Sequence, residues 1–343
     1  MINLEVPQIW IAEDGHRIIQ DHSIDDVMDS AIYYYEKENS FVSYKYRKLF
    51  LDNGAYSSAR KGLELNREKV IRVQERLSPD LTIPLDYPLS PIDTLYSFRK
   101  KWRKTVENIL YWQNCTTLNG RLAPALHSWN WTSLKENIEW LQKYSDSDII
   151  CLGSIVNPSI ISKNHYFGDR ICSKEFIFII YKTIQIINKL SDFKIHVMGY
   201  GSSPLSLHLA FWLGVNSTDS AGHRRRAAYG NIILPGTSDR YVGGRDGKFI
   251  SKKPNGKELK LISDCGCPIC RENSNLLWKS WEARAIHNKF VIKNERERAE
   301  FWLSEGRDFY EKQLEELFSQ TGIYPLWKYA KILMKYPSIT KLL

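Results

Sequence analysis

The 343-residue sequence lacks the motifs that mark several common protein classes. No Gly-x-Gly-x-x-Gly motif follows the first predicted strand and no P-loop is present, which argues against the dinucleotide-binding and phosphate-cradling versions of an α/β fold. No apolar run is long enough to cross a bilayer, so no membrane segment is expected. No repeat or low-complexity tract occurs. With 43% hydrophobic and 25% charged residues, the composition is that of an ordinary globular protein.

Cysteine is scarce, with six residues in the chain. They form no disulfide framework, and the first residues, 1–4, do not begin a secretory leader, so we expect a cytoplasmic protein. Cys115, Cys151 and Cys172 are isolated in apolar surroundings. Their default interpretation is that of small buried hydrophobic side chains.

The other three cysteines, Cys265, Cys267 and Cys270, fall within six residues, and His287 follows after one helix-sized segment. Three thiolates and an imidazole can hold one tetrahedral Zn²⁺ and close its coordination shell. The alternative is a redox pair, because Cys267 and Cys270 also form a Cys-x-x-Cys motif. A third thiol and the absence of a thioredoxin-type strand-to-helix unit favour structural zinc.

Basic residues outnumber acidic residues by 48 to 39, which gives a net charge of +9 and favours a polyanionic partner. A merely basic surface would give the same count. Two segments favour nucleic acid. Residues 99–104 place Lys101 and Arg103 around a tryptophan, and residues 223–226 bring together Arg224, Arg225 and Arg226.

Short apolar runs alternate with helix-length segments, which is typical of β/α units. Strands are expected at 8–11, 48–51, 81–85, 122–126, 149–152, 195–198, near Val215, and less clearly at 232–234. Helices are expected at 66–77, 91–114, 133–144, 173–190, 205–213 and 295–320. The length allows a (β/α)8 barrel that forms a single unit over residues 1–343.

Polar residues follow many of the predicted strands. If the strands close into a barrel, these residues line one mouth, where the active sites of such barrels lie. They are Asp52, Asn53 and Tyr56, then Asp86, His127, Gly153 with Ser154, Gly199, and Asp219. Taken singly, Asp52 can be a turn aspartate, Asp219 a helix N-cap, and the glycines ordinary tight turns. Three carboxylates at one mouth favour a catalytic site.

The order of these motifs resembles that of the tRNA-guanine transglycosylase superfamily over roughly residues 45–290. The segments that carry the resemblance are Leu-Asp-Asn-Gly-Ala-Tyr at 51–56, Leu-Asp at 85–86, His-Val-Met-Gly-Tyr-Gly-Ser-Ser-Pro at 196–204, Gly-Val-Asn-Ser-Thr-Asp-Ser at 214–220, residues 226–230, the Cys-x-Cys-x-x-Cys motif, and a His-Asn pair.

The resemblance implies a TIM barrel with a zinc-binding subdomain at about 258–295 and a C-terminal helix at about 295–320. It also implies the exchange of guanine in a polynucleotide for a free 7-deazaguanine base. By their match to the family motifs, Asp219 is the nucleophile and Asp52 the general acid and base. Such an exchange would keep the sugar configuration through a covalent glycosyl-enzyme ester.

The same resemblance implies the contacts of the base. Asp86 would accept hydrogen bonds from its Watson–Crick edge, and the backbone of Gly153 and Ser154 would meet its carbonyl. A pocket for an unstacked base also needs an aromatic wall, for which Tyr56 and Tyr200 are the candidates. Further substrate contacts are expected at Asn53, His127 and Gly199.

Departures from the family pattern indicate a changed polymer. Residues 127–130, His-Ser-Trp-Asn, replace a glutamine-bearing segment, residues 222–226 replace Pro-Thr-Arg after the nucleophile, and the interval from Cys270 to His287 is short. These features are most similar to the DNA-modifying DpdA branch of bacteria and phages, and no appended RNA-binding domain is expected.

The leading hypothesis is a DNA-guanine transglycosylase that uses a base such as 7-cyano-7-deazaguanine in the cytoplasm of a bacterium or a phage-infected cell. The alternatives are a divergent tRNA-guanine transglycosylase and a catalytically inactive nucleic-acid-binding subunit. A homodimer, or a helper protein that opens the duplex, stays open.

Overall fold

The computed structural model describes residues 6–13, 15, 18, 21–37, 39–90, 92–115, 117–118, 120–153, 174–237, 239–243 and 254–336. The chain divides into two compact units. Unit 1 is formed mainly by Ser23–Met198, and unit 2 mainly by Gly199–Leu343, with which most of the first strand also groups. The prediction of a single barrel over residues 1–343 stays a prediction.

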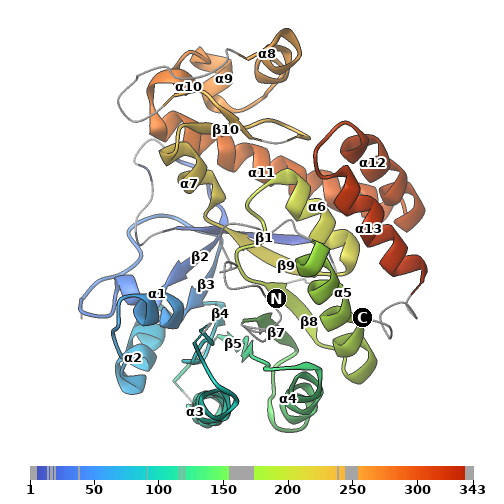
Figure 1. Ribbon diagram of the computed structural model, residues 1–343. Coiled ribbons are helices and arrows are strands. Elements are labelled where there is room, and N and C mark those ends of the chain that lie inside the picture. Colours follow the sequence, from blue (N-terminus) through green and yellow to red (C-terminus); the bar gives the residue numbers. More distant parts are fainter. Residues whose placement is uncertain are drawn as a thin grey trace. The chain divides into compact units, whose positions relative to one another are not determined.

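Unit 1 contains two runs of parallel strands (Figure 1). The first has the order β5-β4-β3-β2 and the second β6-β7-β8. Their bounds are β2 Asp26–Ser30, β3 Lys48–Asp52, β4 Leu81–Thr82, β5 Arg121–Leu122, β6 Ala125–Leu126, β7 Ile149–Leu152 and β8 Lys194–Val197. The register places Ser30 of β2 opposite Asp52 of β3. Both residues are therefore at the carboxyl ends of their strands.

Three helices of unit 1, α2, α3 and α4, begin after residues that cap them. Asn66, Thr94 and Asn130 each accept a hydrogen bond from a backbone N–H of the first turn. The helices are η1 Ala31–Tyr33, α1 Ala55–Arg60, α2 Arg67–Leu77, α3 Leu95–Gln113, α4 Trp131–Tyr144 and α5 Lys174–Leu190. A buried core joins β2 and β3 to α2, with Val27, Leu49, Leu51 and Val70 at its centre.

Unit 2 pairs β1 (Gln8–Ala12) with β9 (Ser217–Ser220) in parallel, and β10 (Asn231–Ile233) with β11 (Asp239–Tyr241) in antiparallel. Its helices are α6 Pro204–Leu213, α7 Gly222–Ala228, α8 Gly256–Ser263, α9 Pro268–Asn273, α10 Leu276–Lys279, α11 Trp281–Ser304, α12 Arg307–Ser319 and α13 Tyr324–Lys335.

Helix α11 organises unit 2, since it contacts α6, α7, α12 and β10. Its buried Asn288 accepts a hydrogen bond from Ile233 N at 2.6 Å and donates to the carbonyl oxygens of His223 and Asn231. One side chain thus satisfies backbone groups from two other elements, which fixes β10 against the helix.

Most predicted elements are present, and the α/β class is confirmed by parallel strands that alternate with helices. Closure into an eight-stranded barrel is not shown and stays a prediction. Over residues 295–320 the structure has the end of α11 and then α12 rather than one helix. The break is at Gly306, whose φ of 104° is outside the helical region.

Strand β2 was not predicted from the sequence. Its run Asp-Val-Met-Asp-Ser places two aspartates among five residues, a composition that strands disfavour. Among the described residues, no helix is both long and apolar enough to span a membrane.

Candidate functional site

Asp52 ends strand β3, and the turn that follows fixes its carboxylate. Its Oδ2 accepts hydrogen bonds from Ser30 Oγ and from Gly54 N, both at 3.0 Å. Gly54 has a φ of 84°, and a Cβ there would lie 2.8 Å from Cβ of Ile32. Only glycine fits this turn without strain, so the Gly-Ala step after Asn53 serves the geometry of Asp52.

Asp29, a neighbour of Ser30, was missed by the sequence analysis. Its Oδ1 accepts hydrogen bonds from Gly15 N at 3.0 Å and Ser30 N at 2.8 Å, and its Oδ2 from the hydroxyls of Tyr34 and Tyr44, each at 2.7 Å. Burial raises the pKa of Asp29, and the four hydrogen bonds oppose that rise. Asp29 thus anchors the end of β2, from which Ser30 reaches Asp52.

Asp86 lies beyond strand β4, and two neighbours orient its carboxylate. Asn53 Nδ2 donates to Asp86 Oδ1 at 2.8 Å and to Pro84 O at 2.7 Å, while His127 Nε2 is 2.6 Å from Asp86 Oδ2. His127 is only 2% exposed. Because a carboxylate offers about four acceptor positions, Asp86 keeps capacity for further donors. The structure therefore places Asn53 and His127 as supports of Asp86.

Gly153 packs against the imidazole of His127. A Cβ at this position would lie 2.6 Å from Cε1 of the ring, so the close approach requires glycine. The N–H of Gly153 donates to Leu126 O at 3.1 Å, and a base carbonyl would have to compete with that bond. The predicted contact of Ser154 lies outside the described residues. Tyr56 is on α1 and 41% exposed, and its role as an aromatic wall stays a prediction.

In unit 2, Asp219 lies within β9 opposite Trp10 of β1, and it is almost fully buried. Its Oδ1 accepts a hydrogen bond from Gly199 N at 2.5 Å. The N-cap of the following helix α7 is Ala221, so Asp219 is not a capping residue. Helix capping therefore does not explain why an aspartate is present at position 219.

The glycines before α6 allow the chain to lie close to β9. Gly201 N donates to Asp219 O at 3.0 Å, and a Cβ at Gly201 would lie 2.4 Å from Ile9 Cδ1. A Cβ at Gly222 would likewise lie 2.7 Å from Ser202 O. Gly199 itself has a φ of 71°. Close packing against β1 and β9 therefore requires glycine at 201, whereas the positive φ favours glycine at 199.

The predicted cationic residues differ in availability. Arg224 is buried, whereas Arg226 donates to Ser202 O at 2.8 Å and pairs with Asp239 at 2.5 Å. Arg225 is exposed, and among the described residues it has no ion pair. In unit 1, Lys101 pairs with Asp93 at 2.6 Å, and Arg103 is exposed.

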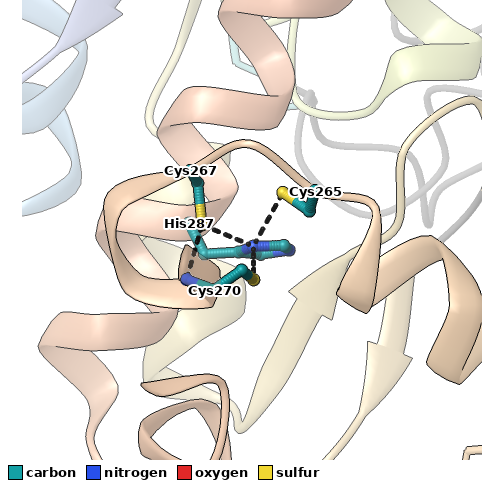
Figure 2. A group of neighbouring side chains, drawn as sticks. All are labelled: Cys265, Cys267, Cys270 and His287. Carbon is teal, nitrogen blue, oxygen red and sulfur yellow. Dashed lines mark hydrogen bonds between the residues drawn. The ribbon is translucent and has the colours of Figure 1, made fainter. Parts of the chain in front are cut away.

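The structure brings Cys265, Cys267, Cys270 and His287 together, with their ligand atoms all within 4.8 Å of one another. The sulfur atoms of Cys265, Cys267 and Cys270 lie 3.6, 3.4 and 3.4 Å from Nδ1 of His287 (Figure 2). A tetrahedral zinc with Zn–S of about 2.3 Å and Zn–N of about 2.05 Å would place sulfur and nitrogen about 3.6 Å apart. The donor set therefore fits one four-coordinate metal ion.

Neighbouring groups prepare these ligands. His287 Nε2 donates to Ile233 O at 2.9 Å, which leaves Nδ1 as the ligand atom. Cys270 N donates to Cys267 Sγ at 3.2 Å, since Cys267 caps α9. Burial lowers the pKa of His287, but the hydrogen bonds and charges of the thiols prevail and raise it to about 9, so a cation that binds here must displace the proton from Nδ1. The cluster can hold a cation that four protein ligands enclose.

Together, the fold and these residues define an α/β protein with a Cys3His metal-type centre and carboxylates fixed at strand ends. No protein-family model matches the chain. It is 22% identical over 317 residues to a tRNA-guanine(15) transglycosylase of Sulfolobus acidocaldarius. The aligned region covers 88% of this chain and 57% of that enzyme. It is also 23% identical over 260 residues to "Uncharacterized protein 306" of Sulfolobus islandicus rod-shaped virus 1. That aligned region covers 75% of this chain and 76% of the viral protein. The chain thus spans little more than half the length of the archaeal relative, and this weak similarity supports the transglycosylase superfamily.

Proposed function

We propose that this chain is a DNA-guanine transglycosylase, which replaces guanine in DNA by a free 7-deazaguanine base such as 7-cyano-7-deazaguanine. The observation that carries the proposal is the buried carboxylate of Asp219, held by Gly199 N inside a strand where it caps no helix. The distant similarity to a tRNA-guanine(15) transglycosylase supports the reaction class.

In the first step, a carboxylate oxygen of Asp219 attacks C1′ of the deoxyribose, and the bond from C1′ to guanine N9 breaks. The electron pair of that bond leaves with guanine, and Asp52 as general acid supplies the proton that the base takes up. The product is an ester between C1′ and Asp219. The sugar–phosphate chain stays intact throughout.

In the second step, the incoming 7-deazaguanine attacks C1′ through its N9, whose proton passes to Asp52. The ester bond breaks and the carboxylate of Asp219 is restored. Two inversions at C1′ keep the original configuration, which is the outcome expected of a carboxylate nucleophile. The hydrogen bonds that Ser30 and Gly54 donate to Asp52 Oδ2 would orient this carboxyl group for both proton transfers.

Base selection is assigned to Asp86. Its carboxylate would accept hydrogen bonds from the ring N–H and the exocyclic amine of a guanine-like edge, because both are donors. Asn53 and His127 hold the two oxygens from the other side, which limits their rotation. Adenine presents an acceptor at the matching ring nitrogen and would leave Asp86 with one unmatched contact.

The metal centre is assigned a structural Zn²⁺. Cys265, Cys267, Cys270 and His287 would complete its shell and leave no position for a substrate. When bound, the ion would tie the segment around α9 to α11 and take no part in the exchange.

Two departures from the tRNA-enzyme pattern support DNA as the polymer. His127 contacts Asp86 where those enzymes carry a glutamine, and of the arginines that follow Asp219, Arg224 is buried and Arg226 is paired with Asp239. Exposed Arg225 is then the expected phosphate contact of this segment. The similarity to the archaeal enzyme keeps tRNA as the second candidate.

The decisive experiment incubates the protein with radiolabelled 7-deazaguanine bases and, separately, with single-stranded DNA, duplex DNA or tRNA. Label is expected in DNA for the wild type and, on the order of 10⁴-fold more slowly, for Asp219→Asn. Exposed Asp192 offers the matched control, and Asp192→Asn should exchange at the wild-type rate. If label were found in tRNA alone, tRNA would replace DNA as the proposed substrate. Full activity of Asp219→Asn would show that Asp219 is not the nucleophile.

A further inference from the structure

A hollow of about 320 Å³ lies in unit 1 beside Asp86. One side is formed by α1 and the segment after it, and the other by α3 and the segment after Asp86. Its lining is largely apolar and includes Ala55, Ala59, Leu63 and Leu85. The volume is at the lower end of that of small-ligand sites, roughly 300–1,000 Å³, and suits one nucleotide rather than a duplex. We call this hollow the lysine groove.

Three lysines of α3, Lys100, Lys101 and Lys104, line the groove. They are not equivalent. Lys101 is committed to Asp93 and Pro88 O, and Lys104 lies 5.0 Å from the ring centre of Tyr87 and 3.8 Å from Glu64. Lys100 is exposed and has no ion pair among the residues that the structure describes. Its ammonium group is therefore available to an anion.

The acidic groups nearly balance the three lysines, because Lys101 pairs with Asp93 and Lys104 with Glu64, so among the described residues Lys100 is the groove lysine without an acidic partner. Glu64 is 83% exposed, and its contact with Lys104 at 3.8 Å is a weak surface pair. Asp86 is already contacted by Asn53 and His127. Lys100 thus gives the groove a charge that complements a phosphate, while most of the other lining residues are apolar.

Aromatic surface adjoins these cations. Tyr87 lines the groove, and Tyr96 is 79% exposed one helical turn before Lys100 on α3. Exposed aromatic rings next to lysines are typical of sites for single-stranded nucleic acid, where bases stack and phosphates meet ammonium groups.

We propose that the lysine groove binds one nucleotide of the polynucleotide, next to the nucleotide whose base is exchanged. Its phosphate contacts Lys100 and its base lies over Ala59 and Leu63. The identity of the polymer rests on the proposed function, in which Asp86 binds the base to be exchanged. Asp86 also lines the groove. The groove would therefore hold the strand on one side of the reacting guanosine.

The test is equilibrium binding of a fluorescein-labelled single-stranded DNA octamer to the full chain, measured by anisotropy over a range of salt concentrations. Lys100→Glu is expected to weaken binding by about fivefold at low salt. It should also lower the salt slope by about 0.7, as for one lost phosphate contact on a single strand. Ala59→Phe fills the groove from an exposed position and should weaken binding with the slope unchanged.

Lys135 on α4 is exposed and does not line the groove, so Lys135→Glu is the charge-matched control. The inference is overturned if the wild type does not bind the octamer, or if Lys100→Glu and Ala59→Phe both bind as Lys135→Glu does. This assay needs no catalysis. If the wild type exchanges no base but its DNA binding depends on Lys100 and Ala59, the proposed function is wrong and the groove is still a nucleotide-binding site.

Discussion

Ser30 Oγ donates a hydrogen bond of 3.0 Å to Oδ2 of Asp52 across two paired strands. The same oxygen accepts Gly54 N from the following turn. Two donors from different elements thus set the rotation of one carboxyl group. In turn, Asp29 holds the backbone of Ser30 through its N–H. This arrangement makes Ser30 a positioning residue for the proposed general acid.

Replacing Ser30 by alanine should lower kcat for base exchange about tenfold, because one hydrogen bond to a charged group is worth ~1.5 kcal/mol. KM for the polymer should stay near the wild-type value, since Ser30 touches no substrate in this proposal. Steady-state kinetics with labelled base measures both.

Rescue separates positioning from a general structural role. Ser30→Thr keeps the hydroxyl and should restore most of the activity, whereas a loss equal to that of Ser30→Ala would contradict the role. The exposed hydroxyl of Ser263 on α8 offers a control, because Ser263→Ala should change neither kcat nor KM.

A second prediction concerns His127, which is buried against Asp86 and Gly153. His127→Phe keeps a flat ring but removes the donor to Asp86. We expect KM for the free base to rise about tenfold, which corresponds to the loss of one charged hydrogen bond. Isotope-exchange kinetics at varied base concentration measures it.

The exposed histidine His22 gives the matched control, and His22→Phe should leave KM for the base unchanged. If His127→Phe lowers the rate at saturating base and leaves KM intact, Asp86 is not oriented by His127 for base binding.

A third prediction concerns the metal centre. The purified protein should contain one zinc ion per chain, and Cys267→Ser should contain almost none, because structural zinc sites are almost always completed by four protein ligands. Removal of the ion should lower the temperature of unfolding, since metal binding is coupled to folding. Elemental analysis and calorimetry measure the two effects.

Cys115 in unit 1 takes no part in the cluster, so Cys115→Ser should keep its zinc and its unfolding temperature. Full zinc content in Cys267→Ser would show that this thiol is not a ligand. A redox-active Cys267–Cys270 pair would appear instead as a disulfide in the oxidised protein.

The metal cluster could be predicted from the sequence because a closed tetrahedral site demands few ligands at short spacing. Three thiols and the first histidine downstream left little choice, and the structure brings all four together. Three carboxylates were also predicted from the sequence, because polar residues that follow apolar runs are easily recognised: Asp52 at the end of β3, Asp86 after β4 and Asp219 within β9. The pattern alone does not show what each carboxylate does.

Other features depend on packing that local sequence does not reveal. Strand β2 contains Asp26 and Asp29, and only the tyrosine hydroxyls and backbone N–H groups that surround Asp29 make its burial tolerable. Two of those partners, Gly15 and Tyr44, lie 14 and 15 residues away in the sequence. His127 contacts Asp86 and packs against Gly153, neither of which is near it in the sequence, and its predicted contact with the substrate stays a prediction. Long-range contacts decided both outcomes.

The last prediction concerns a buried network in unit 2 that joins α6, α11 and α12. Glu295 Oε2 is 3.0 Å from His208 Nε2, Glu295 Oε1 accepts Gly236 N at 2.7 Å, and His208 Nδ1 is 2.9 Å from the hydroxyl of Tyr310. Burial alone raises the pKa of Glu295, but the contacts with His208, Arg298 and Gly236 outweigh burial and lower it below the usual value of 4.5.

A carboxyl group with a lowered folded-state pKa stabilises the fold above its unfolded pKa, and that contribution is lost as the pH falls through the folded value. Wild-type protein should therefore lose stability below about pH 4.5, by up to ~1.36 kcal/mol per pH unit for this group. Glu295→Gln should be about 2 kcal/mol less stable at pH 7 and have a shallower acid slope. Urea unfolding at pH 3 to 7 measures both.

Glu300→Gln on the same helix removes only a surface pair with Arg296 and should keep the wild-type slope, because exposed pairs contribute little. Equal slopes for wild type and Glu295→Gln would mean that Glu295 does not carry the acid sensitivity of this unit.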